Sequence, residues 1–289
     1  MANSTILEAQ QWASSYFNDH LETSDPQLAE LLMEDLFQWT RTEMLMNRRG
    51  ELSDAQWKRY QQAVLAVAEG QPEQYVVGRA PFFGRSFQVT PAVLIPRPET
   101  EELVEWVLTD NPTDTMKSML DIGTGSGVLA ISLALERSTW QVTGTDISEA
   151  AIAVANQNAD QLGAKVTWTT GDLFSGIGQQ RYDVIVSNPP YISETERPLM
   201  DQSVLDFEPD LALFADNDGL AIYQRLANEL AQHLTPQGCA YFEIGFAQGS
   251  AVVSLMKRAL PEAEVTLKQD INGHDRMVRV QLVTGGAIA

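Results

Sequence analysis

Strand-like and helix-like patterns alternate through the last 170 or so residues, and this alternation constrains the fold more than any other feature. Short apolar runs typical of buried strands lie at residues 119–122, 141–145, 166–169, 183–187 and 239–244, with helical patterns at 128–136, 149–161, 219–233 and 250–259. Such a series predicts an α/β fold with a mostly parallel, doubly wound sheet, because parallel neighbours need a crossover connection. Two final strand patterns, at 264–268 and 277–282, are separated by a short Asn-Gly segment. They predict an antiparallel last strand in a seven-stranded sheet.

The residues before this series show other secondary-structure patterns. Residues 1–72 read as a small helical domain, in which Ser53 and Gln56 form a helix-start signal and Gly70 a stop. Residues 73–97 contain short β-rich runs broken by Gly and Pro, which predict a β-hairpin connector. Pro98 can open a helix to about residue 108. We therefore expect a helical domain at 1–72, a connector at 73–97 and the α/β domain at 98–289.

Composition limits the partners and the compartment. The 289 residues carry a net charge of -20, which argues against a large phosphate-contact surface. The acidity either keeps the protein soluble or attracts a basic partner, and composition alone does not choose. There is no apolar run of membrane-spanning length and no secretory signal pattern, and the single cysteine, Cys239, excludes an internal disulfide. We expect a cytoplasmic protein with no membrane association.

A glycine-rich loop follows the first predicted strand of the series and runs directly into a helix. It reads Gly-Thr-Gly-Ser-Gly at residues 123–127, after Asp121. Glycines let a ligand approach the backbone closely, and the following helix start offers N–H donors. Dinucleotide enzymes place G-x-G-x-x-G here, whereas the third glycine of this chain comes one residue sooner, a form that resembles the cofactor loop of class I methyltransferases. The alternative is a tight turn that binds nothing.

The next two strands also end in acidic residues. Asp146 lies where a carboxylate accepts both ribose hydroxyls of a bound nucleoside, although it could instead begin the following helix, a role also open to Ser148. Asp172 ends the third strand, where it could accept a hydrogen bond from an adenine amino group while Leu173 packs on the ring. A simple turn at the strand end is the alternative for this pair.

Asn188, Pro189, Pro190 and Tyr191 follow the strand at 183–187 and carry the most specific signal. An amide or arylamine nitrogen is a poor nucleophile because its lone pair is delocalised. The Asn188 side-chain oxygen and the Pro189 carbonyl can accept its two hydrogens, which orients the lone pair and stabilises the charge that develops. Tyr191 offers a flat face to a planar target group. A proline-rich turn without function is the alternative.

The loop and this motif together resemble the amino-methyltransferases that act on adenine, cytosine or glutamine nitrogens. Five further segments narrow the resemblance to the release-factor glutamine methyltransferases, the PrmC/HemK family: residues 74–78, 94–101, 206–209, 218–220 and 275–276. The resemblance runs from about residue 74 to 280, and the first 70 residues fit the family's N-terminal domain only in size and type. It implies a Rossmann-like class I methyltransferase fold.

The resemblance also implies an activity: transfer of a methyl group from S-adenosyl-L-methionine to the glutamine of the Gly-Gly-Gln motif in peptide-chain release factors. The residues that it assigns to the cofactor are Gly123, Thr124, Gly125, Ser126, Gly127, Asp146, Leu173 and Asn188. The residues that it assigns to the glutamine are Asn188, Pro189, Pro190 and Tyr191, with Asn188, Pro189 and Tyr191 as the catalytic ones. Family members often have an aromatic residue in place of Leu173. Arg97 and Glu99 either shape the site entrance or serve structure alone.

Two other functions are alternatives to this interpretation. A DNA or RNA adenine methyltransferase would use the same Asn-Pro-Pro-Tyr chemistry, but it needs a basic groove and a target-recognition region, and the sequence indicates neither. A catalytically silent binding module could grip a translation partner with the N-terminal helices. We expect a monomer with release factors as partners and no stable nucleic-acid binding. The three histidines lack metal-ligand spacing, so no metal is expected.

Overall fold

The structure is a computed structural model that describes residues 4–21 and 25–283. Its contacts divide the chain into two compact units. The first, here called the helical unit, extends to Arg79 and includes Asp201–Phe207; the second, the sheet unit, comprises Ala80–Met200 and the chain from Glu208 onward. None of the helices in the described part of the chain has the length and apolar character needed to cross a lipid bilayer.

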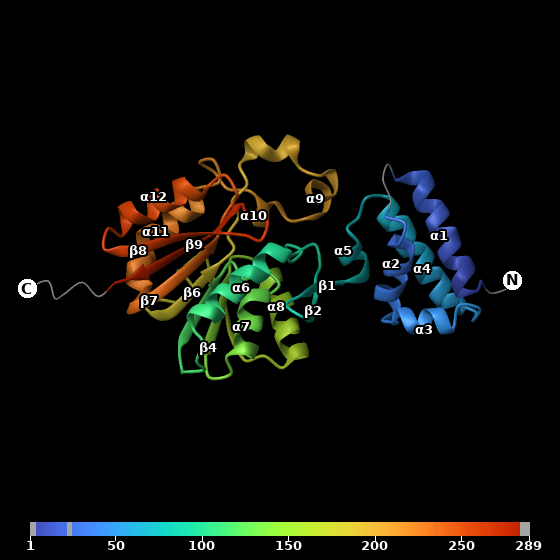
Figure 1. Cartoon of the computed structure of the whole chain (residues 1–289), viewed down its shortest axis with the longest axis horizontal. Helices are drawn as coiled ribbons and strands as arrows, with labels where there is room; N and C mark the ends of the chain where they lie inside the picture. Colours follow the sequence, from blue (N-terminus) through green and yellow to red (C-terminus); the bar gives the residue numbers. More distant parts are fainter. Residues whose placement is uncertain (1–3, 22–24, 284–289) are drawn as a thin grey trace, which may run out of the picture. The chain divides into compact units, whose positions relative to one another are not determined.

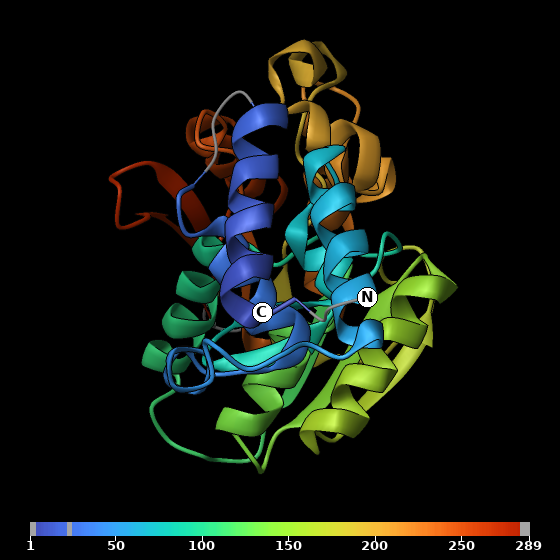
Figure 2. The ribbon, with the colours of Figure 1, turned by 90° about the vertical axis from the view of Figure 1, so that its right-hand side faces the viewer.

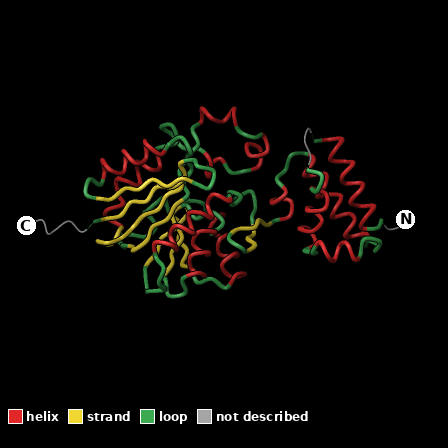
Figure 3. Tube along the Cα trace, in the orientation of Figure 1, coloured by secondary structure: helices red, strands yellow, loops and turns green. Residues whose placement is uncertain are grey.

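Figure 3 draws the described residues of the helical unit mainly as helices joined by loops. Its elements are α1 (Ile6–His20), α2 (Leu28–Phe37), α3 (Arg41–Met46), α4 (Asp54–Ala68), α5 (Glu73–Val77) and α9 (Gln202–Phe207). Ser53 and Gln56 form the predicted capping box at the start of α4. Helices α1 and α4 run side by side (Figure 2) around buried Phe17 and Tyr60. The Tyr60 hydroxyl donates to the Ala29 carbonyl at 2.7 Å, so this buried polar group is satisfied.

Helix α5 differs from the β-rich run predicted for its residues. Tyr75, Val76 and Val77 have high strand propensity, yet the segment is one short helix that ends at Gly78 in the left-handed conformation. The buried Tyr75 ring outweighs the local preference. A two-stranded hairpin lies in this region, but it begins later, with β1 (Arg79–Phe82) and β2 (Arg85–Gln88).

The sheet unit contains the predicted seven-stranded sheet, in the order β5-β4-β3-β6-β7-β9-β8. Its strands are β3 (Ser118–Ile122), β4 (Gln141–Asp146), β5 (Val166–Thr170), β6 (Tyr182–Ser187), β7 (Leu234–Glu243), β8 (Ala263–Gln269) and β9 (Asp275–Leu282). The first five are parallel, and β9 is antiparallel to both β7 and β8. The predicted fold class is confirmed. Strand β7 begins five residues before the start predicted for it.

Helices cover both faces of this sheet (Figure 1). One face packs against α6 (Pro98–Asp110), α7 (Val128–Glu136) and α8 (Glu149–Leu162), and the other against α11 (Ala221–His233) and α12 (Gly249–Ala259). Alternate residues of each strand enter opposite cores, as the pleat requires: Met119 faces α6–α8, and Leu120 faces α11 and α12. Burial on both faces explains the continuous apolar runs by which the strands were recognised.

The long connection from β6 to α11 was not assigned structure from the sequence. Within the sheet unit it contains a 3-10 helix (Glu194–Leu199) and the short α10 (Asp210–Leu213). Its first residues, at the end of β6, meet the turn before α11, where Asn217, Asp218 and Gly219 all have positive φ. A Cβ on Gly219 would lie 1.9 Å from the Tyr191 carbonyl oxygen. Only glycine allows this approach.

We therefore expect Gly219→Ala to lower the free energy of unfolding by about 2–5 kcal/mol, because left-handed strain and overlap with a backbone carbonyl add together. Gly163→Ala is the matched control. Gly163 also has positive φ, at +71°, but a Cβ there meets nothing within 4 Å. The control should lose only about 1–2 kcal/mol in urea unfolding. Equal losses in the two variants would contradict the role given to the Tyr191 contact.

Candidate active site

The glycine-rich loop joins β3 to α7 and is folded against the end of β4. The N–H groups of Gly123 and Thr124 donate to the Thr145 carbonyl at 2.9 and 3.0 Å. The Ser126 carbonyl accepts from the Asn158 side chain at 2.9 Å. Gly127 is the N-cap of α7 with φ +85°, and a Cβ there would lie 2.9 Å from the Ile131 side chain. Contacts with β4, α7 and α8 thus hold the loop in place.

Asp121, at the end of β3, was noted in the sequence but given no role. Its Oδ2 accepts from the Thr124 hydroxyl at 2.5 Å and from the Ala130 N–H at 3.1 Å. It therefore caps α7, a function that the side-chain-free Gly127 cannot perform. Its Oδ1 has no hydrogen-bond partner among the described residues. Burial raises the pKa of this carboxyl to about 7.

Asp146 accepts two backbone N–H groups, from Gly125 to Oδ2 and from Ser148 to Oδ1, each at 2.9 Å. Burial raises its pKa. Ser148 is the N-cap of α8 and accepts from the Ala151 N–H, so the helix-start role falls to Ser148. A carboxylate has about four acceptor positions, so Asp146 retains acceptor capacity for a ligand hydroxyl.

A cavity of about 390 Å³ opens at the carboxyl ends of these strands. This volume lies in the range of small-molecule sites. Ten of the twelve residues predicted for the site line it: Gly123, Thr124, Gly125, Ser126, Asp146, Asp172, Leu173, Asn188, Pro189 and Pro190. Gly127 and Tyr191 lie outside the lining. The structure thus brings together side chains from the ends of β3, β4, β5 and β6.

The wall after β5 is formed by Asp172 and Leu173. The Asp172 carboxylate pairs with the Arg225 guanidinium of α11 at 2.8 Å, and both side chains are exposed. Leu173 has φ +52°, a conformation that costs a branched residue about 1–2 kcal/mol, and it lines the cavity. Phe174 points away into the core and stacks on His233. The residue that faces the cavity is therefore aliphatic.

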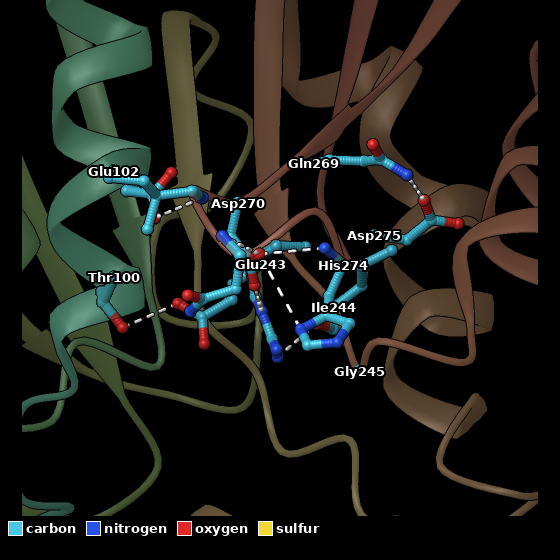
Figure 4. Close-up of polar contacts among 12 residues, drawn as sticks. Thr100, Glu102, Glu243, Ile244, Gly245, Gln269, Asp270, His274 and Asp275 are labelled. Carbon is cyan, nitrogen blue, oxygen red and sulfur yellow. Dashed lines mark hydrogen bonds and ion pairs between the residues drawn. The ribbon is translucent and has the colours of Figure 1, made fainter.

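Asn188 is the first residue after β6, and its side chain is held from behind. The Asn188 Nδ2 donates to the Thr100 hydroxyl of α6 at 3.2 Å. Thr100 in turn donates to Glu243 Oε2 at 2.6 Å (Figure 4). The Tyr191 hydroxyl makes a longer contact, 3.4 Å, with Glu243 Oε1. Sequence reasoning missed Thr100 and Glu243, because the two belong to segments far apart in the chain.

Glu243 is fully buried at the end of β7. Burial raises its pKa to about 7, against the lowering effects of the Thr100 hydrogen bond and the Arg276 guanidinium. Arg276 is fixed by its own ion pair with Asp270, at 3.1 Å. The Tyr191 carbonyl accepts from the Gln248 side chain at 2.9 Å. The ring and the backbone of Tyr191 are thus both anchored.

Arg97 lines the cavity and pairs with buried Glu208 at 2.6 Å. This ion pair joins residues 94–101 to residues 206–209, two of the segments on which the resemblance to the PrmC/HemK family was based. Glu99 does not line the cavity, and its charge raises the pKa of Glu243. No group of His, Cys, Asp and Glu side chains within residues 4–21 and 25–283 is arranged to hold a metal ion.

Two protein families match segments of the chain. Residues 100–205 match the family described as "Methyltransferase small domain", and residues 8–78 match "PrmC N-terminal domain". A methyltransferase structure from Pyrococcus furiosus shares the fold, with a TM-score of 0.52 and 17% identity over 76% of this chain and 96% of that one.

Curated relatives are similar along nearly the whole sequence. A release factor glutamine methyltransferase of Enterococcus faecalis is 40% identical over 94% of this chain and 97% of its own length. One of Bacillus cereus is 41% identical over 96% and 99%. Identity at this level over two full lengths shows common family membership, and the chain belongs to the family of release factor glutamine methyltransferases.

Proposed function

We propose that this protein transfers the methyl group of S-adenosyl-L-methionine to the side-chain amide nitrogen of the glutamine in the Gly-Gly-Gln motif of peptide-chain release factors. The observation that carries the proposal is the position of Asn188 and Pro189. They lie in one cavity with Asp146 and the glycine-rich loop. Groups suited to hold a planar amide are thus placed beside groups suited to hold a nucleoside.

The cavity fits the cofactor in size and in donor set. Asp146 lines the cavity and retains acceptor capacity for the ribose hydroxyls, and Leu173 offers an apolar surface to the base. We assign the Asp172 carboxylate, which lines the cavity and pairs with Arg225, to the adenine amino group. S-adenosyl-L-methionine, when bound, supplies an electrophilic methyl group on its sulfonium. The glycines 123–127 keep the loop free of side chains that would block this approach.

The amide of the substrate glutamine is a weak nucleophile. Asn188 Oδ1 and the Pro189 carbonyl accept its two hydrogens, which fixes the direction of the nitrogen lone pair. The same two dipoles stabilise the positive charge that grows on the nitrogen during transfer. Pro190 stiffens the loop, and Tyr191, outside the cavity lining, supports the far side of the motif. We assign Asn188 and Pro189 as catalytic residues and Pro190 as a substrate contact. Tyr191, which the resemblance also implied as catalytic, is assigned to hold the motif in position.

The rest of the chain is proposed to serve the same reaction. The helices of residues 1–72, which have a hydrophobic core of their own, recognise the release factor; residues 73–97 connect, and residues 98–289 catalyse. A net charge of -20 supports a basic protein partner over DNA or RNA, and therefore disfavours the adenine methyltransferase alternative. We propose a monomer that acts in the cytoplasm.

Asn188→Ala should reduce turnover about 10²–10³-fold, because one preorganised acceptor at the reacting nitrogen is lost. The fold and cofactor binding should be retained. Asn156→Ala, an exposed asparagine on α8, is the matched control and should leave turnover unchanged. Turnover of Asn188→Ala within threefold of wild type, with normal cofactor binding, would refute the assigned role.

Asp146→Ala should weaken cofactor binding more than it slows turnover at saturation. Loss of a charged acceptor costs about 1.5–3 kcal/mol, which corresponds to roughly a 10- to 100-fold higher Kd. Calorimetric titration with S-adenosyl-L-methionine measures this. Glu149→Ala removes the same charge from an exposed site nearby and should not change Kd. An unchanged Kd for Asp146→Ala would exclude ribose binding.

The substrate class is tested with three acceptors: a release factor, the same factor with its loop glutamine changed to alanine, and duplex DNA. Only the first should take up labelled methyl groups. Added salt should slow association with little effect on the rate at saturation, because screening beyond a Debye length of about 8–10 Å acts on long-range attraction first. Methyl transfer to DNA, or equal transfer to the glutamine-free factor, would reject the glutamine assignment and favour the adenine alternative.

A further inference from the structure

The carboxyl group of Glu243 sits behind the motif, outside the cavity lining, and is the last acceptor in a chain of hydrogen bonds that begins at the cavity. The chain runs from Asn188 Nδ2 to Thr100 Oγ1 at 3.2 Å and from Thr100 Oγ1 to Glu243 Oε2 at 2.6 Å. Figure 4 shows the Thr100 hydroxyl of α6 directed at the Glu243 carboxylate. All three side chains come from different elements of the sheet unit.

The direction of each bond in this chain follows from the proton count. An ionised carboxylate has no proton and can only accept. Thr100 has a single hydroxyl proton, and it is donated to Glu243. The Thr100 oxygen can therefore only accept from Asn188, so the Asn188 amide must present its NH₂ to Thr100. Its Oδ1 is left on the opposite side, and among the residues that the structure describes this oxygen has no protein partner.

In the opposite orientation the Asn188 amide could not accept a hydrogen from the substrate nitrogen. If the amide were rotated by 180°, its NH₂ would face the NH₂ of the substrate glutamine, and two donors would meet. The shapes of the two orientations are nearly identical, so packing alone does not select between them. Selection must come from a hydrogen-bond partner of fixed polarity.

We propose that Glu243 is a positioning residue for methyl transfer: through Thr100, its carboxylate fixes the orientation of the Asn188 amide so that Oδ1 faces the substrate nitrogen. This inference rests on the proposed function of Asn188. Glu243 touches neither the cavity nor the reacting atoms. Its partners on the other side, Arg276 and the Tyr191 hydroxyl, support the ionised form.

Thr100→Val removes both bonds of the relay while keeping the shape of the side chain, and it should lower kcat about 10- to 100-fold. Thr100→Ser keeps the hydroxyl and should stay within about twofold of wild type. The Kd of S-adenosyl-L-methionine and the KM for the release factor should change little in both. Thr109→Val, the same change at an exposed position of α6, is the matched control and should have no effect.

Glu243→Gln removes the charge of the side chain but keeps nearly the same shape. It therefore tests the hydrogen-bond polarity of Glu243 apart from its packing. The new amide can accept from Thr100 or donate to it, so the Asn188 amide is no longer held in one orientation. We expect kcat about three- to tenfold lower at pH 8. A thermal unfolding scan and cofactor titration confirm that each variant is folded.

The pH dependence of kcat adds a readout that a purely structural role would not change. The pKa of Glu243 is raised to about 7 by burial and by Glu99, against Thr100, Arg276 and Tyr191. Below this pH the carboxyl is protonated and can donate to the Thr100 oxygen. The Thr100 hydroxyl can then donate to Asn188 Oδ1, so the Asn188 amide is no longer held with Oδ1 toward the substrate. Wild-type kcat should therefore fall as pH decreases through about 7, and Glu243→Gln should lose this inflection.

The outcomes separate this inference from the function on which it rests. If wild type does not methylate the release factor, or Asn188→Ala is fully active, the proposed function itself fails. If both behave as expected but folded Thr100→Val and Glu243→Gln turn over at the wild-type rate, only the positioning role fails. An inflection that persists in Glu243→Gln also overturns it, since another group then controls the pH profile.

Discussion

Parallel pairing of β3 with β4 on one side and β6 on the other is the constraint on which the site depends. Register places Ile122 opposite both Thr145 and Ser187, so the residues that follow these strands emerge at one edge. The chain runs outward from β3 to β4 and β5 and then returns to β6 on the opposite side, which makes this edge the point where strand order reverses. Crevices form at such points, because the two connections leave in opposite directions.

Two buried carboxyls stabilise the backbone that this crevice exposes. Burial disfavours the charge of Asp121 and of Glu243, and raises the pKa of each to about 7. Each nevertheless accepts hydrogen bonds from two elements: Asp121 from the loop and α7, and Glu243 from α6 and, at 3.4 Å, from the motif. Burying these carboxyls costs stability, and the hydrogen bonds that they accept fix the geometry of the loop and the motif.

Sequence patterns predicted the parts of this arrangement that are local. The apolar runs gave the strands, because both faces of the sheet are buried, and short motifs marked Gly123, Asp146 and Asn188 at strand ends. The Thr100–Glu243 bond joins residues 143 positions apart, and no periodicity encodes such a pair. The helix at Tyr75 was missed for a related reason: tertiary burial of its ring overrode the strand propensity of two valines.

Long-range contacts also connect the terminal hairpin, formed by β8 and β9, to the motif that follows β6. Strand β9 pairs with β7 and brings Arg276 close enough to lower the pKa of Glu243, while the turn before β9 supplies the Asp270 carboxylate that fixes Arg276. Asp270 also accepts the N–H groups of Asn272 and His274, each at 3.0 Å, so the turn is rigid where the ion pair forms. An antiparallel strand added beside β7 therefore does more than cover an edge. It places the Arg276 guanidinium beside the buried carboxyl that lies behind the Asn188–Tyr191 motif.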